Sequence, residues 1–168
     1  YETIWFETRE LTGGSRNIID LSMRCLVERG VPSGTILDLG EPGFMRGVVE
    51  FFGVDPSATG SRKDITLNFE GIDYVGNTIL FPVGRRKNGT WRLQVKGVGP
   101  LGERITDVFR TKGEESYLVH KVVTFTKIAD DYYSMSVFPE SEIEDFAAAS
   151  RVLARNGRTV AARRLGIL

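Results

Sequence analysis

Two polar segments of the sequence combine side chains that hydrogen-bond to bases with side chains that neutralise phosphate. Arginine can donate two parallel hydrogen bonds to guanine, asparagine can pair with adenine, and lysine binds phosphate oxygens. Both segments stand between stretches with the pattern of β-strands, so we expect loops that project their side chains freely. We interpret them as candidate DNA-binding loops. The first loop contains Ser15, Arg16 and Asn17, and the second loop contains Arg85, Arg86, Lys87 and Asn88.

Residues that build nucleophilic or zinc centres are scarce in this chain. It contains one cysteine, Cys25, and one histidine, His120, which together cannot supply a zinc site of Cys and His ligands. Cys25 lies among apolar residues, and we expect a small buried side chain there. His120 lies in a strand-like stretch, which favours a position on a strand face. We therefore expect no structural zinc and no cofactor, and a Cys–His or Ser–His–Asp catalytic centre would rest on His120 alone.

A competing hypothesis makes the chain a magnesium-dependent nuclease. Asp73 precedes a strand and the next strand ends on Gln94-Val95-Lys96, a pattern similar to the Asp…Gln-x-Lys variant of the PD-(D/E)xK nucleases seen in Mrr-like enzymes. In such enzymes the carboxylate and the glutamine hold Mg²⁺, while the lysine stabilises the attacking water. Asp73 falls in a Gly-Ile-Asp turn, which speaks against this hypothesis but leaves it open.

A third hypothesis is a barrel that binds a ligand other than nucleic acid. The aromatic residues Trp5, Phe69, Trp91, Tyr132 and Tyr133 would then line a pocket. Aromatic residues at strand spacing more often belong to a core.

The charges are balanced in number but segregated along the chain. Lysine and arginine total 22, and aspartate and glutamate also total 22. Residues 61–112 hold ten basic and five acidic residues and 151–168 hold five and none, whereas 1–60 hold five and nine and 113–150 hold two and eight. Such segregation can create a basic face on a neutral protein and attract phosphate. Ordinary solvated surface explains the same blocks equally well.

The composition is that of one globular domain. A chain of 168 residues, 41% of them apolar, can bury one full hydrophobic core. The longest apolar runs are too short to cross a bilayer, and no charged-then-apolar leader opens the sequence. We expect a soluble, cytoplasmic protein without membrane association.

Apolar and polar residues alternate from residue 63 onward, which is typical of half-buried strands. The pattern predicts hairpins over residues 65–80 and 117–138, with turns at 71–73 and 129–131. An Asn-Gly pair at 88–89 is a strong hairpin signal and precedes a strand at 91–95. Further expected elements are a strand at 4–9, a helix or strand at 23–29, and helices at 42–52, 100–109 and 141–154, the last opened by a capping box of Ser141 and Glu144.

Residues 12–22, Thr-Gly-Gly-Ser-Arg-Asn-Ile-Ile-Asp-Leu-Ser, resemble the N-terminal recognition arm of the EcoRII-effector-like DNA-binding pseudobarrel family. Residues 74–98, with the tip Gly-Arg-Arg-Lys-Asn, look like the second arm. The family includes specificity domains of restriction enzymes and the B-three domains of plant transcription factors. Either loop taken alone also fits an exposed turn with solubilising charges, and the resemblance favours the DNA-binding interpretation.

The resemblance covers residues 1–138 and implies an α+β, mainly β fold, an open seven-stranded pseudobarrel with flanking short helices. It implies that the two loops clamp the major groove of double-stranded DNA, with Arg92 and Lys96 on phosphates. It also implies the specificity domain of a type II restriction endonuclease or a related DNA-processing protein, whose cleavage belongs to another domain. The expected partners besides double-stranded DNA are a nuclease domain in the same chain or a second copy of the chain in a homodimer. Residues 139–168 have no counterpart in the family, and we expect a C-terminal helix or a linker to another domain there.

Overall fold

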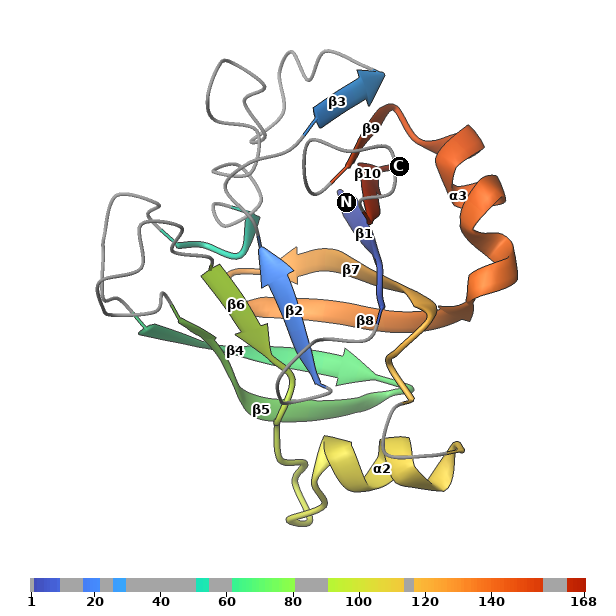
Figure 1. Cartoon of the computed structure of the whole chain (residues 1–168). Helices are drawn as coiled ribbons and strands as arrows, with labels where there is room; N and C mark the ends of the chain where they lie inside the picture. The colour runs from blue at the N-terminus through green and yellow to red at the C-terminus, as the bar shows by residue number, and fades with distance from the viewer. Residues whose placement is uncertain are drawn as a thin grey trace, which may run out of the picture.

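The computed structural model describes residues 2–9, 17–21, 26–29, 51–54, 62–80, 91–113, 117–155 and 163–168. In these residues a single ten-stranded sheet dominates the fold (Figure 1). The strands follow one another across the sheet in the order β2-β6-β5-β4-β8-β7-β1-β10-β9-β3. Their bounds are β1 Thr3–Glu7, β2 Ile18–Leu21, β3 Leu26–Arg29, β4 Arg62–Phe69, β5 Ile72–Leu80, β6 Trp91–Gln94, β7 Lys121–Ala129, β8 Tyr132–Pro139, β9 Val152–Arg155 and β10 Arg164–Ile167.

The α+β, mainly β class expected from the sequence is confirmed. The sheet is open, because its end strands β2 and β3 are not paired with each other. The described residues contain ten strands where a pseudobarrel of the expected type has seven, and the difference arises because the short strands β3, β9 and β10 extend the sheet beyond β1. In the described part of the chain, two short α-helices flank the sheet, α2 at Ile105–Thr111 and α3 at Ile143–Ala149.

Both predicted hairpins are present. β4 and β5 pair antiparallel and are joined at Glu70 and Gly71, which have positive φ angles of 54° and 84°. This turn lies slightly earlier than predicted, since β5 already begins at Ile72. β7 and β8 pair antiparallel on either side of Asp130 and Asp131. β4 also pairs with β8 in parallel, which joins the two hairpins into one sheet.

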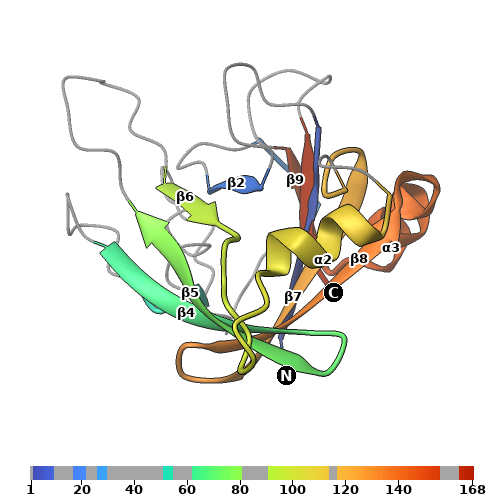
Figure 2. The ribbon, with the colours of Figure 1, turned by 90° about the horizontal axis from the view of Figure 1, so that it is seen from below.

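The sheet curves around one large apolar core (Figure 2). Alternate strand residues point into this core, as the period-two pattern predicts. α2 lies across one end of the curved sheet and buries Ile105 and Phe109. The ring of Phe109 packs edge-on against Phe69, with 5.5 Å between the ring centroids. This helix begins at Ile105 and not at residue 100, because the segment before it forms a turn closed by the bridge between Val98 and Arg104.

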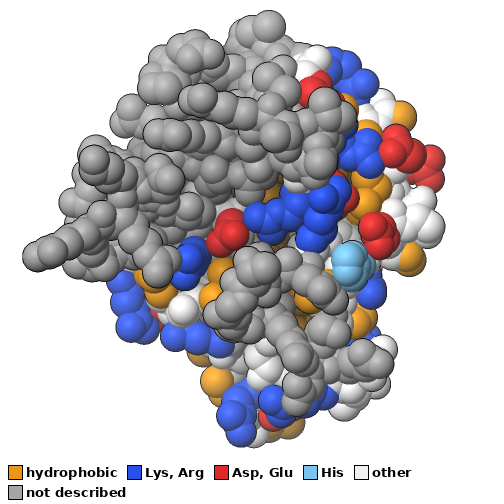
Figure 3. Space-filling view, viewed as in Figure 1, with side chains coloured by type: hydrophobic (Ala, Val, Ile, Leu, Met, Phe, Trp, Pro, Cys, Tyr) orange, Lys and Arg blue, Asp and Glu red, His pale blue; other side chains and the backbone are white. Residues whose placement is uncertain are grey.

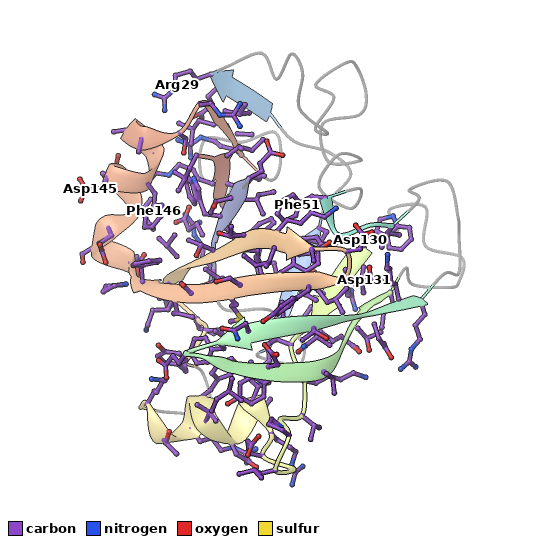
Figure 4. The ribbon with its side chains drawn as sticks, turned by 180° about the vertical axis from the view of Figure 1, so that it is seen from behind. Arg29, Phe51, Asp130, Asp131, Asp145 and Phe146 are labelled. Atoms are coloured by element: carbon purple, nitrogen blue, oxygen red, sulfur yellow. The ribbon has the colours of Figure 1, made fainter. Side chains whose placement is uncertain are left out.

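A second, smaller apolar cluster lies on the other face of the sheet, beneath α3. The ring of Trp5 packs against Phe146, with 5.9 Å between centroids, and its indole N–H donates to Ser150 Oγ at 2.8 Å. Figure 4 shows Phe146 on the side of α3 that faces the sheet and Asp145 on the opposite side. The guanidinium of Arg29 donates to the Ser150 carbonyl oxygen at 2.9 Å, which satisfies a carbonyl at the C-terminal end of the helix.

The C-terminal helix is shorter than predicted. It follows a 3₁₀ turn at Glu140–Glu142 and ends at Ala149, so the prediction that it continues to about Ala154 is wrong. The predicted capping box is also absent, since neither helical segment has a side-chain capping bond at its start. Val152–Arg155 forms β9 because it pairs with β10, and this tertiary pairing overrides local helix preference. Residues 139–168 thus contribute a helix and two strands of the main sheet.

The arginines of the C-terminal basic block tie this tail to the N-terminal part of the chain. The four arginines of the block that the structure describes all pair with acidic residues of the first 30 positions: Arg151 with Glu2, Arg155 with Glu28, Arg163 with Asp20, and Arg164 with Glu7. Charges that are segregated along the sequence are therefore mixed in space here.

Tyr133 provides a test of the packing of the main core. Its hydroxyl donates to the Phe51 carbonyl oxygen at 2.8 Å, and burial raises the pKa of Tyr133 well above its usual range. Tyrosines of the unfolded chain ionise near pH 10 while Tyr133 stays protonated in the fold, so the free energy of unfolding should fall as the pH rises above about 10. Urea unfolding between pH 8 and pH 11 measures this slope, which Tyr133→Phe should reduce. Equal slopes of unfolding free energy against pH in the wild type and in Tyr133→Phe would contradict the raised pKa of Tyr133.

Candidate nucleic-acid interface

β2 and β6 form the antiparallel ladder that adjoins both candidate loops. Asp20 stands opposite Arg92 in this ladder. The carbonyl oxygen of Asn17 extends the pairing by accepting a hydrogen bond from the backbone N–H of Val95 at 2.9 Å. Asn17, predicted in the first loop, is therefore fixed against the end of β6.

The chain enters these two strands at opposite ends of the ladder. Ile18, which follows the first loop, pairs with Gln94, whereas Trp91, which follows the second loop, pairs with Leu21. Four residue steps separate Asn17 from Leu21, or about 13 Å. That spacing is close to the width of a DNA major groove, about 12 Å. The remaining predicted loop residues lie outside the described part of the chain: Ser15, Arg16, Arg85, Arg86, Lys87 and Asn88.

Three polar side chains of one strand face outward together. Arg92, Gln94 and Lys96 alternate with residues that are buried in the core, so they share the outer side of β6 and its extension. Lys96 is exposed and makes no ion pair with any described residue, and the Gln94 carboxamide makes no hydrogen bond within the same part of the chain. Within the described part of the chain, the strand therefore presents a cation and an amide that have no protein partner.

Asn77 fixes the backbone that carries Lys96, a role the sequence analysis missed. This side chain is fully buried in β5, and its Oδ1 accepts hydrogen bonds from the backbone N–H groups of Lys96 at 3.1 Å and Gly97 at 2.8 Å. Its Nδ2 donates to the carbonyl oxygens of Tyr74 and Ile65. The available sequence signal was an asparagine directly after Gly76 inside an otherwise regular strand, a pattern typical of a bulge.

A network of arginines and carboxylates lies beside the ladder. Asp20 pairs with Arg92 at 3.8 Å and with Arg163 at 3.3 Å, and the nearly buried carboxylate of Glu7 pairs with Arg164 and Arg9. A small recess between β1, β2 and β10 is lined by members of this network over apolar residues. Figure 3 shows Lys and Arg side chains gathered on this face with acidic side chains between them.

The proposed nuclease residues are not brought together. Asp73 accepts hydrogen bonds from the Tyr132 hydroxyl at 2.7 Å and the Asn68 amide at 2.8 Å, and these bonds lower the pKa of Asp73. Gln94 pairs with Thr78, which lies five residues beyond Asp73 on β5. Gln94 is therefore about 16 Å from Asp73. A Mg²⁺ ion needs its ligands at about 2.1 Å. The described residues also contain no group of three His, Cys, Asp or Glu side chains that could hold a metal.

His120 does not lie on a strand face, and the aromatic residues do not form the ligand pocket of the third hypothesis. The prediction that His120 lies on a strand face is wrong, because it stands in the turn before β7, exposed and with φ 56°. Trp5 belongs to the cluster beneath α3, whereas Phe69, Trp91 and Tyr133 belong to the main core. Tyr132 lies outside both clusters, so these aromatic residues line no common pocket. Cys25 lies outside the described residues.

No protein-family model matches this chain, and no curated protein sequence matches it. Among the described helices, none has the length and apolar character needed to cross a membrane. The candidate site therefore rests on its own geometry.

Proposed function

We propose that this chain binds double-stranded DNA with sequence preference through the outer side of the β2–β6 ladder and the two flanking loops. The observation that carries the proposal is the ladder itself. It presents Arg92 and Gln94 outward between two loop attachment points about one major-groove width apart, with Lys96 just beyond one of these points. Arginine, glutamine and lysine in one row combine base reading with phosphate binding.

In this proposal each part of the interface has its own role. Lys96 and Arg92 bind phosphates and set the position of the domain on the duplex, while the side chains of the two loops enter the groove and read bases. Cleavage belongs to a nuclease domain of the same protein or of a partner, as in a type II restriction endonuclease, and the protein acts in the cytoplasm. The domain itself needs no metal for this role.

A selection from a randomised duplex pool at low salt tests the binding. We expect enrichment of a defined sequence and an affinity that falls steeply with salt. Absence of both enrichment and measurable affinity would refute the proposal.

Lys96→Ala should weaken binding to all duplexes alike and reduce the slope of log affinity against log salt by about 1, because a phosphate contact is sequence-independent. Lys127→Ala is the matched control, since Lys127 lies on β7 and its removal changes the net charge equally. Fluorescence anisotropy at several salt concentrations gives both quantities. Equal effects of the two substitutions would indicate a general charge effect. Loss of a Mg²⁺-dependent nicking activity in Lys96→Ala with unchanged binding would instead identify a nuclease.

A further inference from the structure

The carboxylate of Asp20 stands between two arginines that come from opposite ends of the chain. Its Oδ1 lies 3.8 Å from Arg92 Nε, and its Oδ2 lies 3.3 Å from Arg163 Nη2. Asp20 and Arg92 face outward from the neighbouring strands β2 and β6, and Arg163 directly precedes β10. All three side chains keep part of their surface in solvent, with exposed fractions of 26% for Asp20, 39% for Arg92 and 21% for Arg163.

The pairing of Arg92 with Asp20 leaves hydrogen-bonding capacity unused. A separation of 3.8 Å is too long for a hydrogen bond, and Arg92 Nε is enclosed without a hydrogen-bond partner in the described part of the chain. A guanidinium hydrogen-bonds strongly to phosphate oxygens, often in a bidentate manner. The arginine pair therefore has the chemistry of a phosphate site that a carboxylate of the same protein partly neutralises.

We infer that Asp20 holds the place of a DNA backbone phosphate and competes with it for Arg92 and Arg163. This inference rests on the proposed DNA-binding function and deepens it. Without DNA, Asp20 keeps both guanidinium groups close to the ladder and limits their attraction for any polyanion. When the duplex seats on β2 and β6, a phosphodiester contacts the two arginines and the carboxylate is displaced. Asp20 then weakens binding to arbitrary DNA and thereby raises discrimination.

The simpler role for Asp20 is structural, as a bridge that fastens the edge strand β2 to the segment before β10. The two roles predict opposite results. A bridge that is removed loosens β2 and weakens DNA binding, whereas a competitor that is removed strengthens binding to non-specific DNA. Measurement of binding to one random-sequence duplex and one selected duplex separates them.

We would measure Asp20→Asn and Asp20→Ser, two small polar replacements without charge. We expect non-specific affinity at low salt to rise about fivefold and the salt slope to steepen by about 1, which corresponds to one additional phosphate contact. Affinity for the selected duplex should rise less, so the ratio of specific to non-specific affinity should fall. Unchanged or weaker non-specific binding in the two variants, with unfolding midpoints like that of the wild type, would overturn the inference.

Asp107→Asn is the matched control for net charge. Asp107 also lies between two arginines, at 3.5 Å from Arg104 and 2.8 Å from Arg110, but it lies on α2, below β2 and β6 in Figure 1. We expect its substitution to leave DNA affinity within about twofold of the wild type. An equal gain in both carboxylate variants would reduce the effect to net charge and overturn the role of Asp20. Failure of the wild-type protein to bind any duplex would refute the proposed function itself, a different result from wild-type binding that Asp20→Asn weakens.

Discussion

Asn77→Ala is expected to lower the free energy of unfolding by about 2–4 kcal/mol. The substitution removes four hydrogen bonds from a fully buried position and leaves the backbone N–H groups of Lys96 and Gly97 without an acceptor. Each buried group left unpaired costs about 1–3 kcal/mol. Urea unfolding followed by tryptophan fluorescence measures the loss, because Trp91 lies in the same core.

Asn68→Ala is the matched control for this prediction. Asn68 lies on the neighbouring strand β4, and its amide donates hydrogen bonds to Asp73 and to the Tyr132 hydroxyl near solvent. We expect its loss to change stability by less than about 1 kcal/mol. Asn77→Ala should also lower the affinity for DNA more than Asn68→Ala does, because Asn77 fixes the backbone of Lys96. Similar stability losses in the two variants would contradict the anchoring role of Asn77.

Gly166→Ala is expected to destabilise the protein by about 2–3 kcal/mol through overpacking. Gly166 pairs directly with Trp5 across β10 and β1, and the indole lies against it. A Cβ at this position would stand 2.6 Å from Trp5 Nε1, 2.8 Å from Ser150 Oγ and 2.8 Å from the carbonyl oxygen of Val152. The backbone oxygen cannot move without disturbing β9. Thermal unfolding with near-ultraviolet circular dichroism would report both the stability and the indole environment.

A double-mutant cycle with Trp5→Phe locates the origin of this effect. Phenylalanine lacks the indole nitrogen that comes closest to the new methyl group, so Gly166→Ala should cost less in the Trp5→Phe background than in the wild type. Fully additive costs would show that the clash with Trp5 does not cause the destabilisation.

The parts of the fold that the sequence predicted are those with local causes. Residues 65–80 and 117–138 form hairpins because their alternating pattern and their turn residues agree within one short segment. β9 and β10 have only four residues each and pair with each other, and their other pairing partners lie in β3 and β1, more than 120 positions away. No local pattern records such partners, so a helix was predicted across part of β9.

In the candidate site, too, the features with local causes were predicted and the long-range contacts were not. Asn17 was predicted from residue type and Arg92 and Lys96 from the family resemblance, and the strand that begins at Trp91 followed from local pattern. The partnership of Asp20 with Arg163 spans 143 positions and could not be predicted from either segment. Charge counts alone predicted a basic tail, whereas the described arginines of that tail are paired with acidic residues near the N-terminus.

The central position of β1 has a consequence for folding. β1 stands between β7 and β10, with Ile4 opposite Phe125 on one side and Ile167 on the other. During synthesis its second edge stays unpaired until residues 164–167, which form β10, have been made. Contacts between residues so far apart in the sequence form slowly. Until they form, the exposed strand edge can pair with a strand of another chain. Nascent copies of this domain should therefore be most prone to aggregate just before β10 emerges.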